Sequence, residues 1–252
     1  MIESKAIYVI WLREIKRFIR AKSRVIGMVV MPLLFLVGLG YGFNNLIVLK
    51  GSFDYFDFLV PGIIGMTLLF TSINNGASII WDKEFGFLKE IMVTPNSRTS
   101  IALGKIIGGA TIALIQGILV MIISILLGFS FSLTYLVLLS VIFMLLISIT
   151  FISLGLAIGS FMSDFQGFGI VMQFIAFPLF FLSGALVPVG ELPNMLKYVA
   201  YANPLTYGVD GLRAVLLGSS SFSIGIDILA IGISACGMVV VCAWAFSKGN
   251  IT

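Results

Sequence analysis

The chain has 252 residues, of which 60% are hydrophobic and only 10% are charged, and its mean hydropathy is +1.15. Soluble domains are usually about 45 to 50% apolar and about 25% charged. The composition therefore argues against a water-soluble core, and the recurring apolar runs indicate helices that cross a membrane several times. We expect a single domain, residues 1–252, of the all-α polytopic membrane class.

The first predicted element is a basic amphipathic helix over residues 5–22. Its bases recur every three to four residues, while Ile7, Trp11 and Phe18 occupy the other side. Such a helix lies in the membrane interface and offers its cations to anionic lipid; the alternative is a simple retention signal at the start of the first span. No pattern of a cleavable signal peptide is present in this stretch. The bases assigned to the interface are Arg13, Lys16, Arg17 and Arg20.

Six apolar stretches follow, over residues 25–43, 58–81, 101–127, 133–161, 167–187 and 224–246. Of the 15 Lys and Arg residues, twelve fall on one predicted side: seven up to Arg24, four from Lys83 to Lys105, and Lys248. Lys50, Lys197 and Arg213 fall on the other side. The positive-inside rule therefore predicts a multi-pass protein of the cytoplasmic membrane with both termini in the cytoplasm.

Residues 82–105 contain seven charged residues between two of these apolar stretches. Phe85, Leu88 and Met92 follow one another at helical spacing, and Pro95 is expected to end that helix. A short cytoplasmic helix with an apolar stripe and charges of both signs favours docking to a soluble partner. The polar surface is expected to come from Asp82, Glu84, Lys89 and Glu90. The next span is expected to be capped by Ser97 or Thr99.

The segment from Leu186 to Leu217 is only moderately apolar and is interrupted by prolines. The spacing predicts two short helices that break at Asn203-Pro204 and lie in or on the outer leaflet. An ordinary extracellular loop is the alternative. Asp210 and Arg213, three residues apart, are expected to form a local salt bridge.

Several kinds of chemistry find no support in the sequence. A phosphate-binding loop ending at Gly104-Lys105 would need Gly at 99 and Ser or Thr at 106, where the chain has Thr99 and Ile106. There is no His, and the two cysteines support neither a disulfide framework nor a metal site. We expect no catalytic, cofactor-binding or metal-binding residues and no nucleic-acid partner. The amides Asn74, Asn75, Gln116 and Gln173 are assigned to bonds between helices.

Two sequence runs resemble a known family. The run W-D-K-E-F-G-F-L-K-E-I-M-V-T-P-N-S-R from Trp81, followed by A-L-G-K at 102–105, resembles the cytoplasmic signature of ABC-2 type permeases of ATP-binding-cassette exporters. The run A-N-P-L-T-Y-G-V-D-G-L-R at 202–213 resembles a stretch before the last span of the drug-resistance type members. One departure is Lys83, where members often have Arg.

The resemblance implies a membrane subunit that works as a homodimer, or paired with a similar permease, together with two copies of a separate ABC ATPase. ATP and Mg would bind to that partner, with no cofactor in this chain. The family's coupling helix corresponds to about residues 82–93 and its outer re-entrant helices to about 188–217. The implied ATPase-coupling residues are Asp82, Lys83, Glu84, Phe85, Gly86, Leu88, Glu90, Met92, Pro95 and Arg98. The implied outer gate consists of Asn203, Pro204, Tyr207, Asp210 and Arg213.

The function expected from these observations is ATP-driven export of amphipathic or lipidic molecules, such as drug-like compounds, lipids or lipid-linked glycans. The middles of the six stretches carry no ionisable residue, which disfavours a proton-coupled carrier or a channel. Work would then enter mechanically, as the ATPase pushes on Phe85 to Met92. The alternative is a binding or signalling membrane protein that recruits a cytoplasmic partner without moving cargo.

Overall fold

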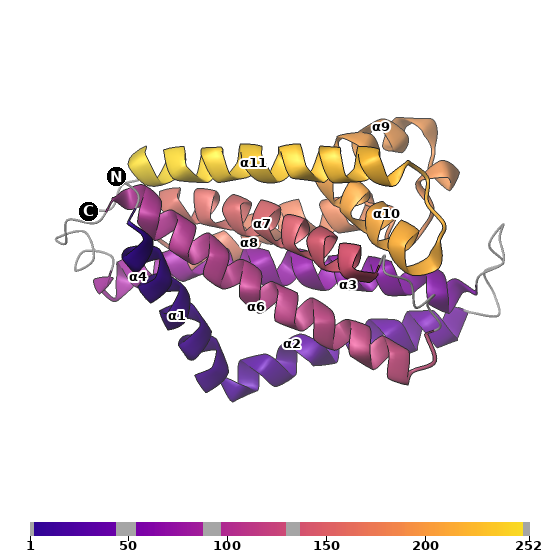
Figure 1. Ribbon diagram of the computed structural model, residues 1–252, viewed down its shortest axis with the longest axis horizontal. Helices are drawn as coiled ribbons and strands as arrows, with labels where there is room; N and C mark the ends of the chain where they lie inside the picture. Colours follow the sequence, from indigo (N-terminus) through magenta and orange to yellow (C-terminus); the bar gives the residue numbers. More distant parts are fainter. Residues whose placement is uncertain (1–2, 44–53, 88–96, 130–136, 249–252) are drawn as a thin grey trace.

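The computed structural model describes residues 3–43, 54–87, 97–129 and 137–248, and within these residues every regular element is a helix. Figure 1 shows an elongated bundle in which both termini lie at the same end. The first half contains α1 (Ser4–Arg20), α2 (Lys22–Phe35), the π-helical turn η1 (Leu36–Tyr41), α3 (Tyr55–Gly76), α4 (Ser78–Glu84) and α6 (Arg98–Leu126). The second half contains α7 (Val137–Phe161), α8 (Phe165–Phe181), the 3₁₀ turn η2 (Val189–Glu191), α9 (Asn194–Ala202), α10 (Pro204–Leu217) and α11 (Ile224–Lys248).

Four helical stretches of the described chain are long and apolar enough to cross a membrane: Tyr55–Glu84, Arg98–Leu126, Leu138–Phe161 and Ile224–Lys248. Two shorter apolar helices cover Val29–Tyr41 and Phe165–Phe181. At 1.5 Å per residue, the 29 residues of α6 extend about 43 Å, more than the roughly 30 Å of bilayer hydrocarbon. The predicted class of all-helical polytopic membrane protein is therefore confirmed, while the number of six spans stays a prediction.

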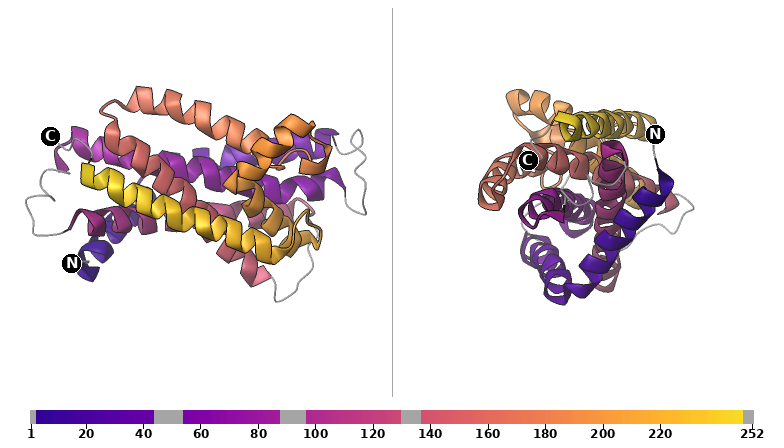
Figure 2. Two further views of the ribbon diagram at one scale, coloured as in Figure 1. Left: turned by 90° about the horizontal axis from the view of Figure 1, so that it is seen from above. Right: turned by 90° about the vertical axis from the view of Figure 1, so that its left-hand side faces the viewer.

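The core of the bundle is α3, which is covered by α6, α7 and α10. The end-on view in Figure 2 shows α3 within the surrounding helices, and most of its apolar side chains are buried. Close packing requires glycine where α3 meets α7, because a Cβ on Gly76 would lie only 2.6 Å from the backbone of Gly155. Small residues allow such close helix contacts in membranes. The α3–α7 contact thus fixes the central pair of the bundle.

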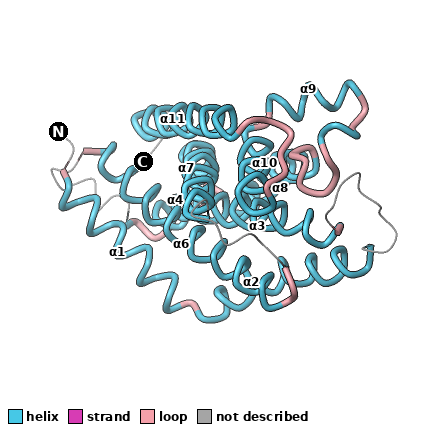
Figure 3. The backbone as a smooth tube through the Cα atoms, turned by 45° about the vertical axis from the view of Figure 1, so that its right-hand side comes forward, coloured by secondary structure: helices cyan, strands magenta, loops and turns pink. Residues whose placement is uncertain are grey.

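The short helices α9 and α10 lie at the end of the bundle opposite the two termini (Figure 1). They correspond to the two helices predicted between Leu186 and Leu217, and their break falls at the predicted Asn203-Pro204. The Asn203 side chain accepts a hydrogen bond of 3.0 Å from the Leu205 amide and so caps α10. α10 packs against α3, α7 and α11, whereas α9 stays at the periphery of the bundle, as the tube in Figure 3 shows. The position of these helices relative to the membrane stays a prediction.

The helix expected over 167–187 ends earlier than predicted. α8 stops at Phe181, and the chain then turns through Ser183 and Gly184. The φ of Gly184 is +78°, a left-handed conformation that glycine adopts without steric cost. The hydropathy of residues 182–187 therefore reflects burial of the turn, since Ala185 is fully buried, and not continuation of the helix.

Candidate functional site

The candidate site begins with the contact between α1 and α6 at the end of the bundle that holds the termini. α1 turns Ala6, Ile10, Glu14 and Phe18 toward the bundle, at four-residue intervals on one face of the helix. Glycines on α6 let it approach closely, because a Cβ on Gly104 would lie 2.8 Å from the Ile10 Cβ. The predicted interfacial helix is thus packed on the bundle along one side, and this packing carries an acidic side chain, Glu14, inward.

The carboxylate of Asp82 on α4 faces cations from two neighbouring helices and is only 2% exposed. Arg13 binds its carboxylate with both guanidinium nitrogens, at 2.7 Å to Oδ1 and 3.3 Å to Oδ2. Arg17 lies 3.7 Å from Oδ1, and Lys105 on α6 forms an ion pair with Oδ2. The sequence assigned Asp82 to an exposed polar surface, and this assignment is wrong because three cations from two other helices enclose the carboxylate.

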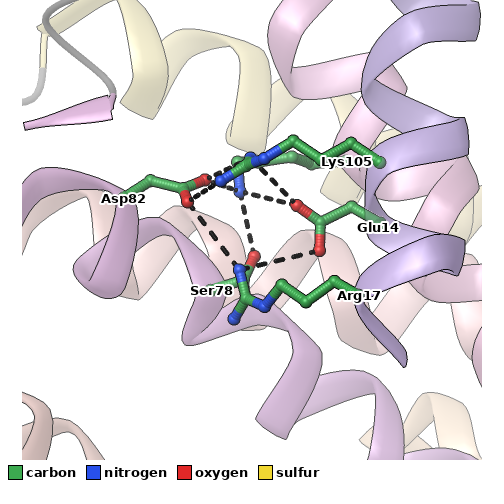
Figure 4. A network of polar contacts seen from close by, with 6 residues as sticks. Glu14, Arg17, Ser78, Asp82 and Lys105 are labelled. Carbon is green, nitrogen blue, oxygen red and sulfur yellow. Dashed lines mark hydrogen bonds and ion pairs between the residues drawn. The ribbon is translucent and has the colours of Figure 1, made fainter. Parts of the chain in front are cut away.

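Lys105 completes the arrangement that we call the ion cluster: Arg13, Glu14, Arg17, Ser78, Asp82 and Lys105, drawn in Figure 4. Lys105 is 1% exposed, and its ammonium lies 3.4 Å from Glu14 Oε1 and donates to Ser78 Oγ at 3.0 Å. Burying an unpaired charge costs several kcal/mol, whereas a charge with a counter-ion and hydrogen bonds is tolerated. The cluster therefore holds α1, α4 and α6 in one mutual arrangement.

A second set of contacts joins α4 to the carboxyl end of α7. The ammonium of Lys83 donates to the carbonyl oxygens of Ser160, Met162 at 3.2 Å and Gly159 at 3.4 Å. Carbonyls at a helix carboxyl end lack partners within the helix and carry partial negative charge, so a cation suits this position. Asp164 then caps the start of α8 by accepting from the amides of Gln166 and Gly167. Lys83 thus joins α4 to the end of α7.

The tip of α4 is exposed. Glu84 is on the surface, and Phe85 is 74% exposed and stacks on Trp81 with ring centroids 5.7 Å apart. α4 ends at Glu84, and Gly86 follows with φ +73°, so the helix predicted over 82–93 is not one uninterrupted helix. Phe87 packs on the guanidinium of Arg13, 3.4 Å from its ring centroid. The predicted coupling residues Leu88, Glu90, Met92 and Pro95, together with Lys89, lie outside the described residues.

The first turn of α6 is anchored by polar contacts near both ends of the chain. Ser97 caps the helix by accepting a hydrogen bond of 3.2 Å from the Ser100 amide, which confirms one of the two predicted capping residues. Arg98 donates to the carbonyl of Ser247 near the end of α11, at 3.0 Å. Arg98, a predicted coupling residue, therefore joins two helices at the base of the bundle.

The four predicted interfacial bases divide between two environments. Arg13 and Arg17 lie about one third exposed and face Asp82 in the ion cluster, whereas Lys16 and Arg20 are exposed on α1. The prediction that all four face lipid headgroups does not hold for Arg13, because it is paired with Asp82. Lys16 and Arg20 have no ion pair among the described residues, and their contact with anionic lipid stays a prediction.

The predicted outer-gate residues gather around α10 at the opposite end. Arg213 is buried, donates to the carbonyls of Gly184 at 3.0 Å and Phe58 at 3.4 Å, and lies over the Phe58 ring. Burial lowers the pKa of Arg213 to about 10, against the opposing charge of Asp210, so the guanidinium stays protonated at neutral pH. Asp210 instead accepts from the amides of Ser221 and Phe222. The predicted Asp210–Arg213 salt bridge is therefore wrong.

The other residues of this group also form contacts that shape α10. The Asn203 amide donates to the Leu179 carbonyl at 2.6 Å, and Pro204 occupies the first turn of α10, where its missing N–H is not needed. The Tyr207 hydroxyl donates to the Tyr201 carbonyl at 2.7 Å. All five predicted residues thus lie on α10 or at its N-cap, and their role as an outer gate stays a prediction.

Comparison with known proteins places this geometry in a family. Residues 5–217 match the model of the ABC-2 type transporter family. The chain belongs to this family. The resemblance read from the runs at Trp81 and Ala202 is thereby confirmed, and membership makes the chain a membrane transport permease of the kind that pairs with an ABC ATPase.

Relatives of the ABC-2 chain cover most of its length. The inner membrane transport permease YadH of Escherichia coli K12 is 30% identical over 217 residues, 83% of this chain and 82% of YadH. The transport permease ycf38 of Cyanophora paradoxa is 28% identical over 235 residues, 88% of this chain and 81% of the relative. Nodulation protein J of Rhizobium meliloti is 27% identical over 222 residues, 84% of this chain and 80% of that protein.

The sequence of this ABC-2 chain did not predict that the residues of the ion cluster contact one another. Two signals were available: Glu14 interrupts the basic face of the first helix, and Lys105 lies inside an apolar stretch. The shortest contacts join different helices, with partners 69 residues apart for Arg13 and Asp82 and 91 residues apart for Glu14 and Lys105. The pairing depends on how α1 packs on α6, which local sequence does not specify.

Proposed function

We propose that this permease is the membrane subunit of an ATP-driven exporter and that a separate ABC ATPase docks at the exposed tip of α4. The proposal rests on a difference in exposure along α4. Phe85 at the tip is 74% exposed, whereas Asp82, three residues earlier, is 2% exposed in the ion cluster. An exposed aromatic residue on a firmly held helix suits a docking contact that transmits force. Glu84 adds a charge to the same surface.

The path of the force follows from the contacts of α4. Asp82 joins it to α1 and α6, and Lys83 joins it to the end of α7. α4 also follows α3 after a short break at Ala77, within one helical stretch over Tyr55–Glu84, so a push at Phe85 would reach the central helix. Closure of the ATPase would then tilt these helices as connected bodies, a two-state rigid-body change of the kind used in transporters.

The proposed cargo is amphipathic or lipidic: a drug-like compound, a lipid or a lipid-linked glycan. Within residues 58–81, 106–126, 137–161, 165–181 and 228–247 there is no Asp, Glu, Lys or Arg. A translocation path built from these segments offers apolar and small polar side chains and no ring of charges, which disfavours ions and free sugars. Export from the cytoplasm or the inner leaflet is the direction that we propose.

The proposed assembly contains two copies of this chain, or this chain and a similar permease, with two ATPase subunits that bind ATP and Mg. We place it in the cytoplasmic membrane with both termini in the cytoplasm. Supporting this orientation, Glu3 and Ser247 both contact the first turn of α6, at the end of the bundle where the predicted cytoplasmic charges gather.

The experiment compares Phe85→Ala and Glu84→Lys with the unaltered chain, co-purified with its ATPase and reconstituted in liposomes. We expect complex formation to weaken at least about tenfold and cargo-stimulated ATP hydrolysis to disappear, because a central aromatic contact commonly contributes 2 kcal/mol or more. Tyr198→Ala is the matched control, since Tyr198 is 76% exposed on α9 at the other end, and it should leave the affinity for the ATPase unchanged.

Two results would contradict the proposal. If Phe85→Ala and Glu84→Lys bind the ATPase as well as Tyr198→Ala does, the α4 tip is not the docking surface. If a stable complex hydrolyses ATP at a rate that no amphipathic drug or lipid changes, and the vesicles accumulate none of them, the chain recruits its partner without transporting cargo.

A further inference from the structure

Two neighbouring cavities of different character meet at Asn74 on α3. The larger one, ≈ 360 Å³, lies between α2, α3 and α8 and is lined mainly by apolar side chains, among them Phe35, Met66, Met172 and Phe177. The smaller one, ≈ 150 Å³, lies between α1, α3, α4, α6 and α8, directly beside the ion cluster. Asn74 lines both. Together they form an apolar chamber with a polar compartment at one end.

The polar compartment contains hydrogen-bond donors that lack an acceptor. Arg17 lines it and makes no hydrogen bond within the described chain; its two ion pairs, to Asp82 and Glu14, are long at 3.7 and 4.0 Å. The buried Nδ2 of Asn75 has no partner among the described residues. Ser78 accepts from Lys105, which leaves its own proton to donate. A buried donor such as the Asn75 amide normally has a partner, so the compartment is suited to an acceptor ligand.

The charges of the ion cluster favour an anion. Arg13, Arg17 and Lys105 are opposed by two carboxylates, so the cluster carries one positive charge in excess. Glu14 also lines the compartment, but its Oε1 faces Lys105 at 3.4 Å. Arg17 is the cation with the longest ion pairs, and its guanidinium is the side chain best matched to a phosphate group. A singly charged phosphodiester satisfies both the donors and the charge.

We propose that these cavities bind one anionic phospholipid, with its phosphodiester against Arg17, Asn75 and Ser78 and an acyl chain in the apolar chamber. The chamber follows α3 from Met66 to Asn74, about 12 Å of helix, beside Phe and Met side chains that suit a hydrocarbon chain. Trp81 lines the polar compartment with Phe165, their ring centroids 5.2 Å apart, as aromatic residues often do at headgroup level. The lipid is a resident ligand, and its binding requires neither ATP nor export of cargo.

Trp81 provides the test, because it lines the headgroup compartment. In the full chain, Trp11→Phe and Trp244→Phe leave Trp81 as the single tryptophan. Its fluorescence is titrated in detergent with phosphatidylglycerol and with phosphatidylcholine, both brominated on the acyl chain, and then with inorganic phosphate as competitor. We expect saturable quenching by phosphatidylglycerol with an apparent Kd at least about tenfold lower than that of phosphatidylcholine, and no displacement by millimolar phosphate.

Two substitutions in the single-tryptophan chain locate the site. Arg17→Gln and Asn75→Leu should each raise the apparent Kd for phosphatidylglycerol about tenfold. Arg20→Gln is the matched control, because Arg20 is exposed one turn further along α1 and does not line the compartment. Asn75 lies outside the ion cluster, so Asn75→Leu keeps the test valid if Arg17→Gln does not fold.

Each contrary result overturns the proposal in a different way. Equal loss in Arg20→Gln means that a general basic surface attracts the lipid. Displacement by phosphate means that the compartment takes a free anion. Quenching that does not saturate, or that is equal for both lipids, means that no headgroup site exists, and it leaves the proposed exporter function untouched because that function is tested by ATPase docking at Phe85.

Discussion

The two ends of the bundle handle buried charge in different ways. At the α1–α4 end, Asp82 and Lys105 are neutralised by side chains from other helices. At the α9–α10 end, Arg213 is held by backbone carbonyls and Asp210 by backbone amides. Both arrangements give these four charged side chains partners of opposite polarity, but the first links helices to one another and the second links α10 to nearby backbone.

The difference bears on how the protein moves. Charge pairs between helices depend on the relative position of those helices, so the ion cluster links the positions of α1, α4 and α6. Bonds from Arg213 and Asp210 to nearby backbone groups fix the local conformation around α10 instead. The α1–α4 end is thus suited to receiving motion, and the α9–α10 end to preserving a fixed local shape around α10.

The largest expected effect is on stability, from Asp82→Ala. The substitution leaves three clustered cations without the carboxylate that they share, and breaking a buried pair in this way commonly costs about 3 to 5 kcal/mol. We expect a loss of that size in the free energy of unfolding, measured by SDS titration in mixed micelles. Asp54→Ala is the control, since Asp54 is exposed and makes no cap bond at the start of α3.

A second substitution tests whether the charge pairing is responsible. Lys105→Met in the Asp82→Ala background removes the most deeply buried cation, which is 1% exposed, and should restore part of the lost stability. If the double variant is less stable than Asp82→Ala by the full cost of Lys105→Met alone, the two residues act independently and the ion cluster does not hold the helices together.

Arg213→Ala is expected to have the next largest effect, about 2 to 4 kcal/mol in the same measurement, because it leaves the carbonyls of Phe58 and Gly184 without their shared donor. Arg213→Lys should recover only part of the loss, since an ammonium lacks the planar fork that reaches two carbonyls and stacks on Phe58. Full recovery with Lys would show that charge alone is needed at the α9–α10 end.

Gly104→Ala tests the packing that brings the ion cluster together. A Cβ at this position would lie 2.8 Å from the Ile10 Cβ, so α1 must shift away from α6, at a cost of about 1 to 3 kcal/mol. The shift should also lengthen the Lys105–Glu14 contact. Gly237→Ala on α11 is the control, because nothing lies within 4 Å of a Cβ there. Equal effects at both glycines would show that helix propensity, and not the α1–α6 contact, sets the result.

The sequence predicted what depends on local pattern. Hydropathy gave the helical membrane class, the Asn203-Pro204 pair gave the break between the two short helices, and Ser97 was predicted as a possible cap. Each of these features is decided within a few residues, by the period of apolar side chains or by the backbone chemistry of Pro, Asn and Ser.

The sequence did not predict what depends on how distant helices meet. From the sequence, Asp82 is predicted to be one of several charges on an exposed amphipathic segment. Its burial follows from the packing of α1 on α6. Asp210 and Arg213 read as a local pair at helical spacing, yet the turn at Gly184 and the loop at Ser221 supply better partners for each.

Lys83→Met is expected to have the smallest effect on stability. It also tests most directly whether the two ends differ through the kind of partner that each buried charge has. Lys83 lies at the α1–α4 end, but like Arg213 it is held by carbonyls, at the end of α7. It is also partly exposed, so water can replace the lost donor, and the loss in unfolding free energy should be about 1 kcal/mol. Lys197→Met on α9 is the control for removing a surface lysine. If Lys83→Met instead costs as much as Asp82→Ala, the position of a charge in the bundle matters more than the kind of partner it has, and the distinction drawn between counter-charges and carbonyls fails.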